Sequence, residues 1–179
     1  RQTSLASRTA WLKIKRKIMA LQETTLQALH ELFPGVASAA QEGLTETPGM
    51  RVTDPAKHGH HLEVLCPPHQ VVALAEVMNR EGYFLESISG VDWPDQGQLE
   101  VVYDYNRLGG EHCRVMVRTR IARDTPQLPT ISGVFPAADW HERETFDFYG
   151  VIFQDHPNLI RILLPEDADF FPLRKDYLP

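Results

Sequence analysis

Two carboxylates near the carboxyl end of the chain have a spacing that could support catalysis. Glu144 and Asp147 are three residues apart, so in a helix they share a face, where proximity could separate their pKa values for general acid and general base roles. This arrangement would suit a hydrolase. The neighbouring His141 and Arg143 allow another interpretation, because carboxylates beside cationic side chains commonly form structural salt bridges.

A second group of residues could bind a divalent metal ion, since closely spaced imidazoles chelate such ions. Histidines in a polar loop are more often simply solvated, so both interpretations stay open. The group comprises His58, His60, His61, His69 and Cys66.

The remaining chemistry-bearing residues indicate no cofactor site in this chain. Cys66 and Cys113 lie far apart, in a spacing that fits neither zinc nor an iron–sulfur cluster, and we interpret them as reduced, buried thiols. A glycine-rich phosphate loop is also missing, because Gly109 and Gly110 fall in a predicted hairpin turn. We therefore expect this chain to bind no flavin, cluster, metal or nicotinamide.

Charge is unevenly distributed along the 179 residues. The first eighteen hold 6 of the 18 basic residues and no acid, which suggests a basic leader, a surface arm, or sequence upstream of a start at Met19. The other 12 basic residues face all 24 acids, so nucleic acid is an unfavourable partner for the body. No apolar run is long enough for a spanning helix, and any membrane contact is expected to be indirect.

The central sequence predicts one α+β domain over residues 19–150. A mainly antiparallel sheet with helices packed on one side is expected, because strand patterns outnumber the helices between them. In the strand over 113–121, small and apolar residues alternate with a largely cationic face, which would be solvated or meet an acidic partner. Residues 36–60 show no period and are expected to form a loop or an irregular strand. The predicted elements are helices over 23–33, 71–78 and 137–149, and strands over 62–66, 83–88, 99–105 and 113–121.

The last predicted helix has aromatic residues on two opposite sides. Trp140 and Phe148 share one side with acids, and Phe146 and Tyr149 share the other. A helix on the surface of a monomer normally has one apolar stripe, so this pattern indicates that protein covers both sides. Either a neighbouring protein or the chain's own tail could provide that cover.

Residues 151–179 form a distinct C-terminal segment, rich in proline and also apolar. A solvated tail would be less apolar, and a long structureless loop is rare in a compact domain. We expect an extended docking arm on a partner protein, with its prolines limiting the entropy lost on docking and its arginines pairing with partner carboxylates.

From residue 142 onward the chain carries the ordered set Glu142-Arg143-Glu144, Asp147, Gly150, Phe153, His156-Pro157, Leu159, Arg161-Ile162-Leu163, Pro165-Glu166-Asp167 and Pro172-Leu173-Arg174-Lys175-Asp176-Tyr177. Together these residues resemble a known family, that of the 30-kilodalton subunit of proton-pumping NADH:quinone oxidoreductase (complex I). Two departures from the family's usual pattern are Ile160 before Arg161, where a second arginine is usual, and Phe170-Phe171 in place of glycine and a bulky or histidine residue. The match covers about thirty-six positions of the chain.

The resemblance implies a non-catalytic subunit of the peripheral arm of the complex, docked on the large quinone-site subunit at the cytoplasmic face of the bacterial plasma membrane. NADH, FMN, iron–sulfur clusters and quinone would be bound by other subunits. Equivalent subunits of energy-converting membrane-bound hydrogenases and of ferredoxin-dependent complexes are similar, and they remain an alternative. The residues expected at the interface with other subunits are Trp140, Glu142, Arg143, Glu144, Asp147, Gly150, Phe153, His156, Pro157, Arg161, Pro165, Glu166, Asp167, Pro172, Leu173, Arg174, Lys175 and Asp176.

Overall fold

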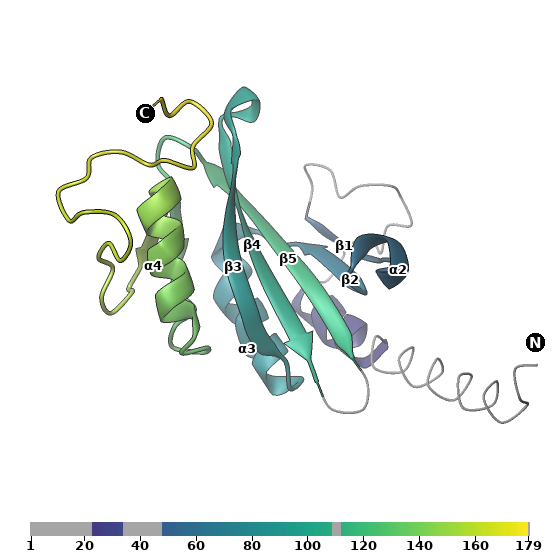
Figure 1. Cartoon of the computed structure of the whole chain (residues 1–179). Coiled ribbons are helices and arrows are strands. Elements are labelled where there is room, and N and C mark those ends of the chain that lie inside the picture. The colour runs from purple at the N-terminus through teal and green to yellow at the C-terminus, as the bar shows by residue number, and fades with distance from the viewer. Residues whose placement is uncertain (1–22, 34–47, 109–111, 179) are drawn as a thin grey trace, which may run out of the picture.

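A computed structural model describes residues 23–33, 48–108 and 112–178 (Figure 1). The basic segment 1–18 lies outside the described residues, as do Gly109 and Gly110 of the predicted hairpin turn. A helix spans 23–32, as expected. The other elements are the strands β1 (Gly49–Val52), β2 (Leu62–Leu65), β3 (Phe84–Trp93), β4 (Gln98–Arg107), β5 (Cys113–Ala122), β6 (Gln127–Pro129) and β7 (Ile152–Gln154), the helices α2 (Pro55–His58), α3 (Val71–Arg80) and α4 (Ala138–Tyr149), and short 3-10 turns at Pro68–Gln70 and Pro94–Gln96.

Five strands form one sheet in the order β1-β2-β5-β4-β3. The β2–β5 pair is parallel and the other three pairs are antiparallel. The chain therefore crosses by way of α3 from β2 to β3, which lies at the far edge, and then returns through the antiparallel β3–β4–β5 meander. The mainly antiparallel α+β prediction is confirmed, and the strands on either side of α3 prove not to be adjacent.

One face of the sheet builds the core together with the helices. The inward residues of β5, from Cys113 to Ile121, are buried at alternate positions, as their pattern predicted. Leu29 of the first helix and Met78 of α3 belong to the same buried cluster. α4 packs against the edge strand β3 (Figure 1). The ring of Tyr149 lies over Gly90 of this strand. The prediction that the helices pack on one side of the sheet is therefore confirmed.

The opposite face of the sheet carries cross-strand ion pairs. Arg118 of β5 bridges Glu63 of β2 (Nε to Oε1, 2.8 Å) and Glu100 of β4 (Nη1 to Oε1, 3.0 Å), and Arg120 reaches the other oxygen of Glu100 at 3.0 Å. Glu100 is fully buried beneath these guanidinium groups. The cationic side of β5 is thus neutralised by acids of its own sheet, which the alternation along a single strand could not reveal.

Several short elements had no clear local signal. β6 and β7 have three residues each and pair in parallel with one another, although 22 residues lie between them in the chain. β3 continues to Trp93, beyond the predicted end at 88, because its whole length pairs with β4. Within the described residues, no helix is long and apolar enough to cross a membrane.

The contact between α4 and β3 predicts the effect of a small substitution. A Cβ atom at Gly90 would lie 2.4 Å from the Tyr149 ring, so Gly90→Ala should force the ring away and reduce the free energy of unfolding by about 1–3 kcal/mol. Gly133→Ala is the control, because a Cβ there meets nothing within 4 Å. Urea unfolding of both full-length variants measures the difference, and equal midpoints would contradict this packing.

Candidate docking surface formed by helix α4 and the C-terminal arm

Helix α4 is enclosed largely by its own chain (Figure 1). One side faces β3, another accepts the loop at Thr130–Ile131, and a third is wrapped by residues 151–178, which we call the arm. Of the two sources of cover that the aromatic pattern allowed, the structure shows the chain's own tail, which contacts α4 together with β3: Arg161 lies over the ring of Phe146, and Leu173 lies in the cleft beside Phe148. Trp140 is the exception, with 64% of its surface exposed.

The carboxylate of Asp147 is the main anchor of the arm. Its Oδ2 atom accepts hydrogen bonds from three consecutive backbone N–H groups, those of Ile162 (3.1 Å), Leu163 (2.7 Å) and Leu164 (3.0 Å). Arg161 Nη1 donates to Oδ1 at 2.8 Å. Burial by itself raises the pKa of Asp147, but these donors outweigh it and hold the pKa below the usual range. Three aligned N–H groups around one anion fix the loop as a backbone anion nest does.

Arg161 connects the anchor to the rest of the arm. Besides the carboxylate, its guanidinium donates to the carbonyl of Asp147 (2.9 Å) and to that of Ala168 (2.6 Å). It also lies over the rings of Phe146 on α4 and Phe171 on the arm, at 5.8 and 5.3 Å. The sequence predicted that Arg161 would pair with a carboxylate of a partner protein, but in the structure its carboxylate partner is Asp147 of the same chain.

A second anchor holds the end of the arm against the sheet. Asp92, at the end of β3, accepts from Arg123 (Nε, 2.7 Å) and from the backbone N–H of Lys175 (2.8 Å). Arg123 also donates to Asp176 at 2.6 Å. The hydrogen bond from Arg123 is the main reason that the pKa of Asp92 is lowered. Sequence analysis missed Asp92 and Arg123, because nothing local relates them to partners so distant in the chain.

Gly150 permits the turn from α4 into the arm. Its φ of 75° lies in the left-handed region, and a Cβ atom would lie 2.6 Å from the ring of Phe171. Arg174 packs over the same ring at 4.9 Å and donates to the carbonyl of Tyr149 at 2.8 Å. Glycine is therefore required both for the backbone conformation and for the close approach of Phe171.

A buried acid secures the amino-terminal half of α4. Glu142 is fully buried and accepts from the hydroxyl of Thr130 and the backbone N–H of Ile131 (2.8 Å). Burial raises the pKa of Glu142 to about 7, although the hydrogen bonds from these two donors lower it. His156 lies beside this acid, with its Nε2 atom 3.8 Å from Oε2 of Glu142. Its Nε2 atom also bonds the carbonyl of Asp139, and its Nδ1 atom accepts from the backbone N–H of Asn158. This arrangement fits the neutral imidazole, in which one ring nitrogen donates and the other accepts.

The anchored arm leaves apolar side chains in solvent. The backbone is fixed by Asp147 and Asp92, yet large hydrophobic residues along it remain about one third to nearly nine tenths exposed. Exposed apolar side chains gathered on one ordered segment are typical of an interaction surface. The set comprises Ile152 (40%), Ile160 (51%), Leu163 (60%), Phe170 (36%), Leu173 (50%) and Leu178 (86%).

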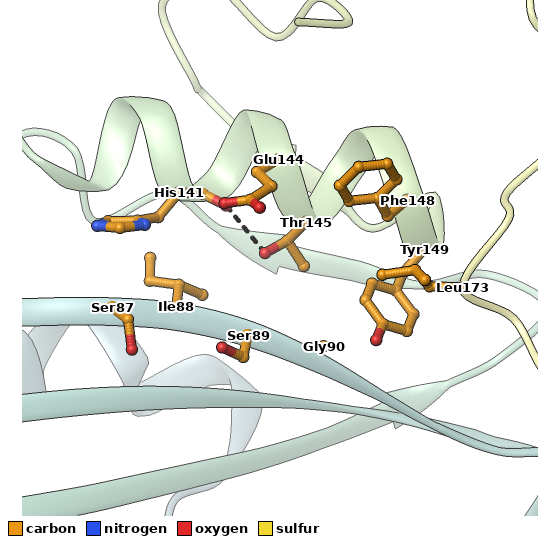
Figure 2. A pocket seen from close by; sticks show the side chains of 10 residues that line it. All are labelled: Ser87, Ile88, Ser89, Gly90, His141, Glu144, Thr145, Phe148, Tyr149 and Leu173. Atoms are coloured by element: carbon orange, nitrogen blue, oxygen red, sulfur yellow. Dashed lines mark hydrogen bonds between the residues drawn. The ribbon is translucent and has the colours of Figure 1, made fainter. Parts of the chain in front are cut away.

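A cleft separates α4 from β3 beside this surface (Figure 2). Figure 2 shows His141 above Ile88 and the ring of Tyr149 beside Gly90, with Leu173 of the arm closing one end. The cleft is lined by Ser87, Ile88, Ser89, Gly90, His141, Glu144, Thr145, Phe148, Tyr149 and Leu173.

The expected interface residues divide into those that serve the fold and those that face outward. Their role in contacting a partner stays a prediction. The domain boundary at residue 150 also stays a prediction, although Val151 and Phe153, which follow it, pack in the core. Buried residues are Glu142, Arg143, Asp147, Gly150 and Phe153; His156, Arg161, Pro172 and Arg174 are half-buried; and Trp140, Glu144, Pro157, Pro165, Glu166, Asp167, Leu173, Lys175 and Asp176 are exposed.

The two alternative chemistries gain no support from the geometry. Asp147 is occupied by the arm, with a lowered pKa, whereas Glu144 is exposed in the cleft, so the pair does not share a catalytic environment. In the part of the chain that the structure describes, no three His, Cys, Asp or Glu side chains are placed to hold a metal ion. His60 instead contacts the carbonyl of His58, and Cys66 donates to that of Pro67.

The Asp147 anchor predicts a large effect from an isosteric change. In Asp147→Asn the amide cannot satisfy three N–H donors and Arg161 together, and the loss should destabilise the domain by about 2–4 kcal/mol and expose the arm to proteases. Glu144→Gln, on the exposed side of the same helix, is the control. Urea unfolding and limited proteolysis are the measurements, and an arm that stays protected in Asp147→Asn would refute the anchor.

Glu142 predicts a pH dependence of stability. Because its folded pKa of about 7 lies above the unfolded value of about 4.5, the folded chain binds more protons between these pH values, and stability falls as pH rises through that window. Other groups titrate as well, so the comparison is with Glu142→Gln, whose stability relative to the native chain should improve from pH 4.5 to 7. A pH-independent difference in unfolding free energy would contradict a raised pKa.

Comparisons with known proteins identify relatives of this chain. The chain is 38% identical over 151 residues to the NADH-quinone oxidoreductase C-subunit of Nocardioides sp. (82% of this chain, 60% of that protein), and 34% identical over 157 residues to that of Salinispora tropica (84% and 58%). It thus spans less than two thirds of the length of these relatives.

A solved structure has the same fold. A chain of the membrane-bound sulfane sulfur reductase, an archaeal respiratory membrane complex, superposes with a TM-score of 0.67 at 24% identity, covering 87% of this chain and 85% of that one. The family model described as the 30 Kd subunit of respiratory-chain NADH dehydrogenase matches residues 64–179, from β2 through the arm. The chain belongs to the family of the 30-kilodalton subunit of respiratory-chain NADH dehydrogenase.

Proposed function

We propose that this chain is a non-catalytic structural subunit in the peripheral part of a proton-translocating NADH:quinone oxidoreductase. Its task is to hold catalytic subunits in place while electrons pass from NADH to quinone through them. Membership of the family supports this role, as do the names of the curated relatives, each the C-subunit of an NADH-quinone oxidoreductase.

One observation carries the proposal: apolar side chains face solvent from an arm whose backbone is already fixed. Ile160, Leu163 and Leu173 are each at least half exposed, although the chain around them is bound by Asp147 and Asp92. Binding by an ordered segment loses little conformational entropy, so the burial of these side chains contributes directly to affinity. The arm thus suits docking on another protein.

The proposed partner is the large quinone-site subunit, with the complex at the cytoplasmic face of the bacterial plasma membrane and this chain touching the membrane only through its partners. Flavin, iron–sulfur clusters, NADH and quinone belong to the other subunits. The chemistry of the cysteines supports this division, because burial raises the pKa of Cys66 to about 12 and also raises that of Cys113, which keeps both as thiols and disfavours cluster ligation.

Substitution of the exposed apolar residues tests the proposal. The triple variant Ile160→Ser, Leu163→Ser, Leu173→Ser should fold but lose most of its incorporation into the complex, because at least half of each residue is already in water in the free protein. The matched control is Val52→Ser, Phe84→Ser, Leu108→Ser, which changes residues 39–69% exposed outside α4 and the arm.

Each variant replaces the native chain in cells and is captured by an affinity tag from gently solubilised membranes. Mass spectrometry then identifies and quantifies the chains that co-purify. Full incorporation of the arm variant, or equal loss in the control, would refute docking through this surface. An NADH-binding partner supports a complex I, whereas a hydrogenase partner would assign the chain to a related complex.

A further inference from the structure

The cations of the arm are committed to the chain itself. Arg161 is bound to Asp147 and to two arm carbonyls, and Arg174 donates to the carbonyl of Tyr149. The ammonium group of Lys175, which is exposed, lies over the ring of Trp93 at 5.2 Å. The cationic groups that the sequence offered to partner carboxylates are therefore largely used to shape the arm.

The acids of the arm have the opposite arrangement. Asp155, Glu166, Asp167 and Asp169 are exposed. Their side chains have no hydrogen-bond or ion-pair partner among residues 23–33, 48–108 and 112–178, while Asp176 is held by Arg123. Three of these carboxylates fall within the four residues 166–169, between the exposed Leu163 and Phe170. The outward surface of the arm thus combines apolar side chains with negative charge that the described residues do not compensate.

We propose that the partner surface that receives the arm is cationic: an apolar depression for Leu163 and Phe170, bordered by lysine or arginine side chains that face Glu166, Asp167 and Asp169. This inference rests on the proposed docking function and specifies the chemistry of the partner. Charge complementarity is the argument, because an acidic or neutral partner would leave the carboxylates unpaired at the edge of the interface. A cationic border also accelerates association and rejects acidic surfaces.

Charge reversal of the three acids provides the test. The variant Glu166→Lys, Asp167→Lys, Asp169→Lys should reduce recovery of the partner with the tagged full-length chain about ten-fold at low ionic strength, because attraction becomes repulsion. The control, Glu31→Lys, Glu76→Lys, Asp95→Lys, has the same net charge and changes exposed acids outside α4 and the arm. In the native complex, moderate salt should weaken recovery of the partner, since exposed charge pairs are screened.

A direct readout comes from carbodiimide treatment of the native complex, which joins a carboxylate to a nearby lysine amine with loss of water. Cross-linked peptides joining residues 166–169 to lysines of an identified partner chain are expected. If charge reversal and salt leave assembly unchanged while the apolar triple variant abolishes it, the arm docks but its partner is not cationic. If neither set of changes affects assembly, the docking function itself fails.

Discussion

The proposed docking surface depends on one interaction, the binding of the C-terminal arm by the buried carboxylate of Asp147. It lies within α4 and must be paired, because an ionised group without partners in such a position is strongly disfavoured. Its partners are three N–H groups and a guanidinium group supplied by the arm. Beyond β7, the described residues of the arm have no regular secondary structure, yet these bonds give the arm one defined path around α4. The backbone N–H groups of residues 162–164 bond inward to Asp147, while Ile160, Leu163 and Leu173 stay at least half exposed.

Buried acids are paired with arginines of the same chain elsewhere in the molecule as well. Arg118 and Arg120 neutralise Glu63 and Glu100 on the face of the sheet opposite the core, and Arg123 joins Asp92 to the end of the arm. These arginines contribute to internal geometry, whereas several acids of the arm have no partner among the residues that the structure describes. The surface where binding is proposed is therefore richer in available acids than in available cations.

This organisation supports the proposed role in docking. Its titratable groups with large departures from ordinary behaviour, such as Glu142 and the buried Tyr103 and Tyr105, are enclosed in packing or bonded to the backbone. Many of the side chains left in solvent on α4 and the arm are apolar or acidic. Family membership and the geometry point in the same direction, although they are independent observations.

Local patterns in the sequence were sufficient for the elements with strong periodicity, such as α3 and β5, because alternation along the chain follows directly from which face is buried. They were sufficient for the family as well, since the ordered identities from 142 to 177 do not depend on the fold. What those residues contact emerged only from the folded chain. Asp92 meets Lys175, and Asp147 meets residues 162–164, because the chain folds back on itself, and pairing between distant positions leaves no local pattern. For the same reason, the predicted arm proved to be bound by its own domain, while several of its apolar side chains, such as Leu163, remain in solvent, where a partner can bury them.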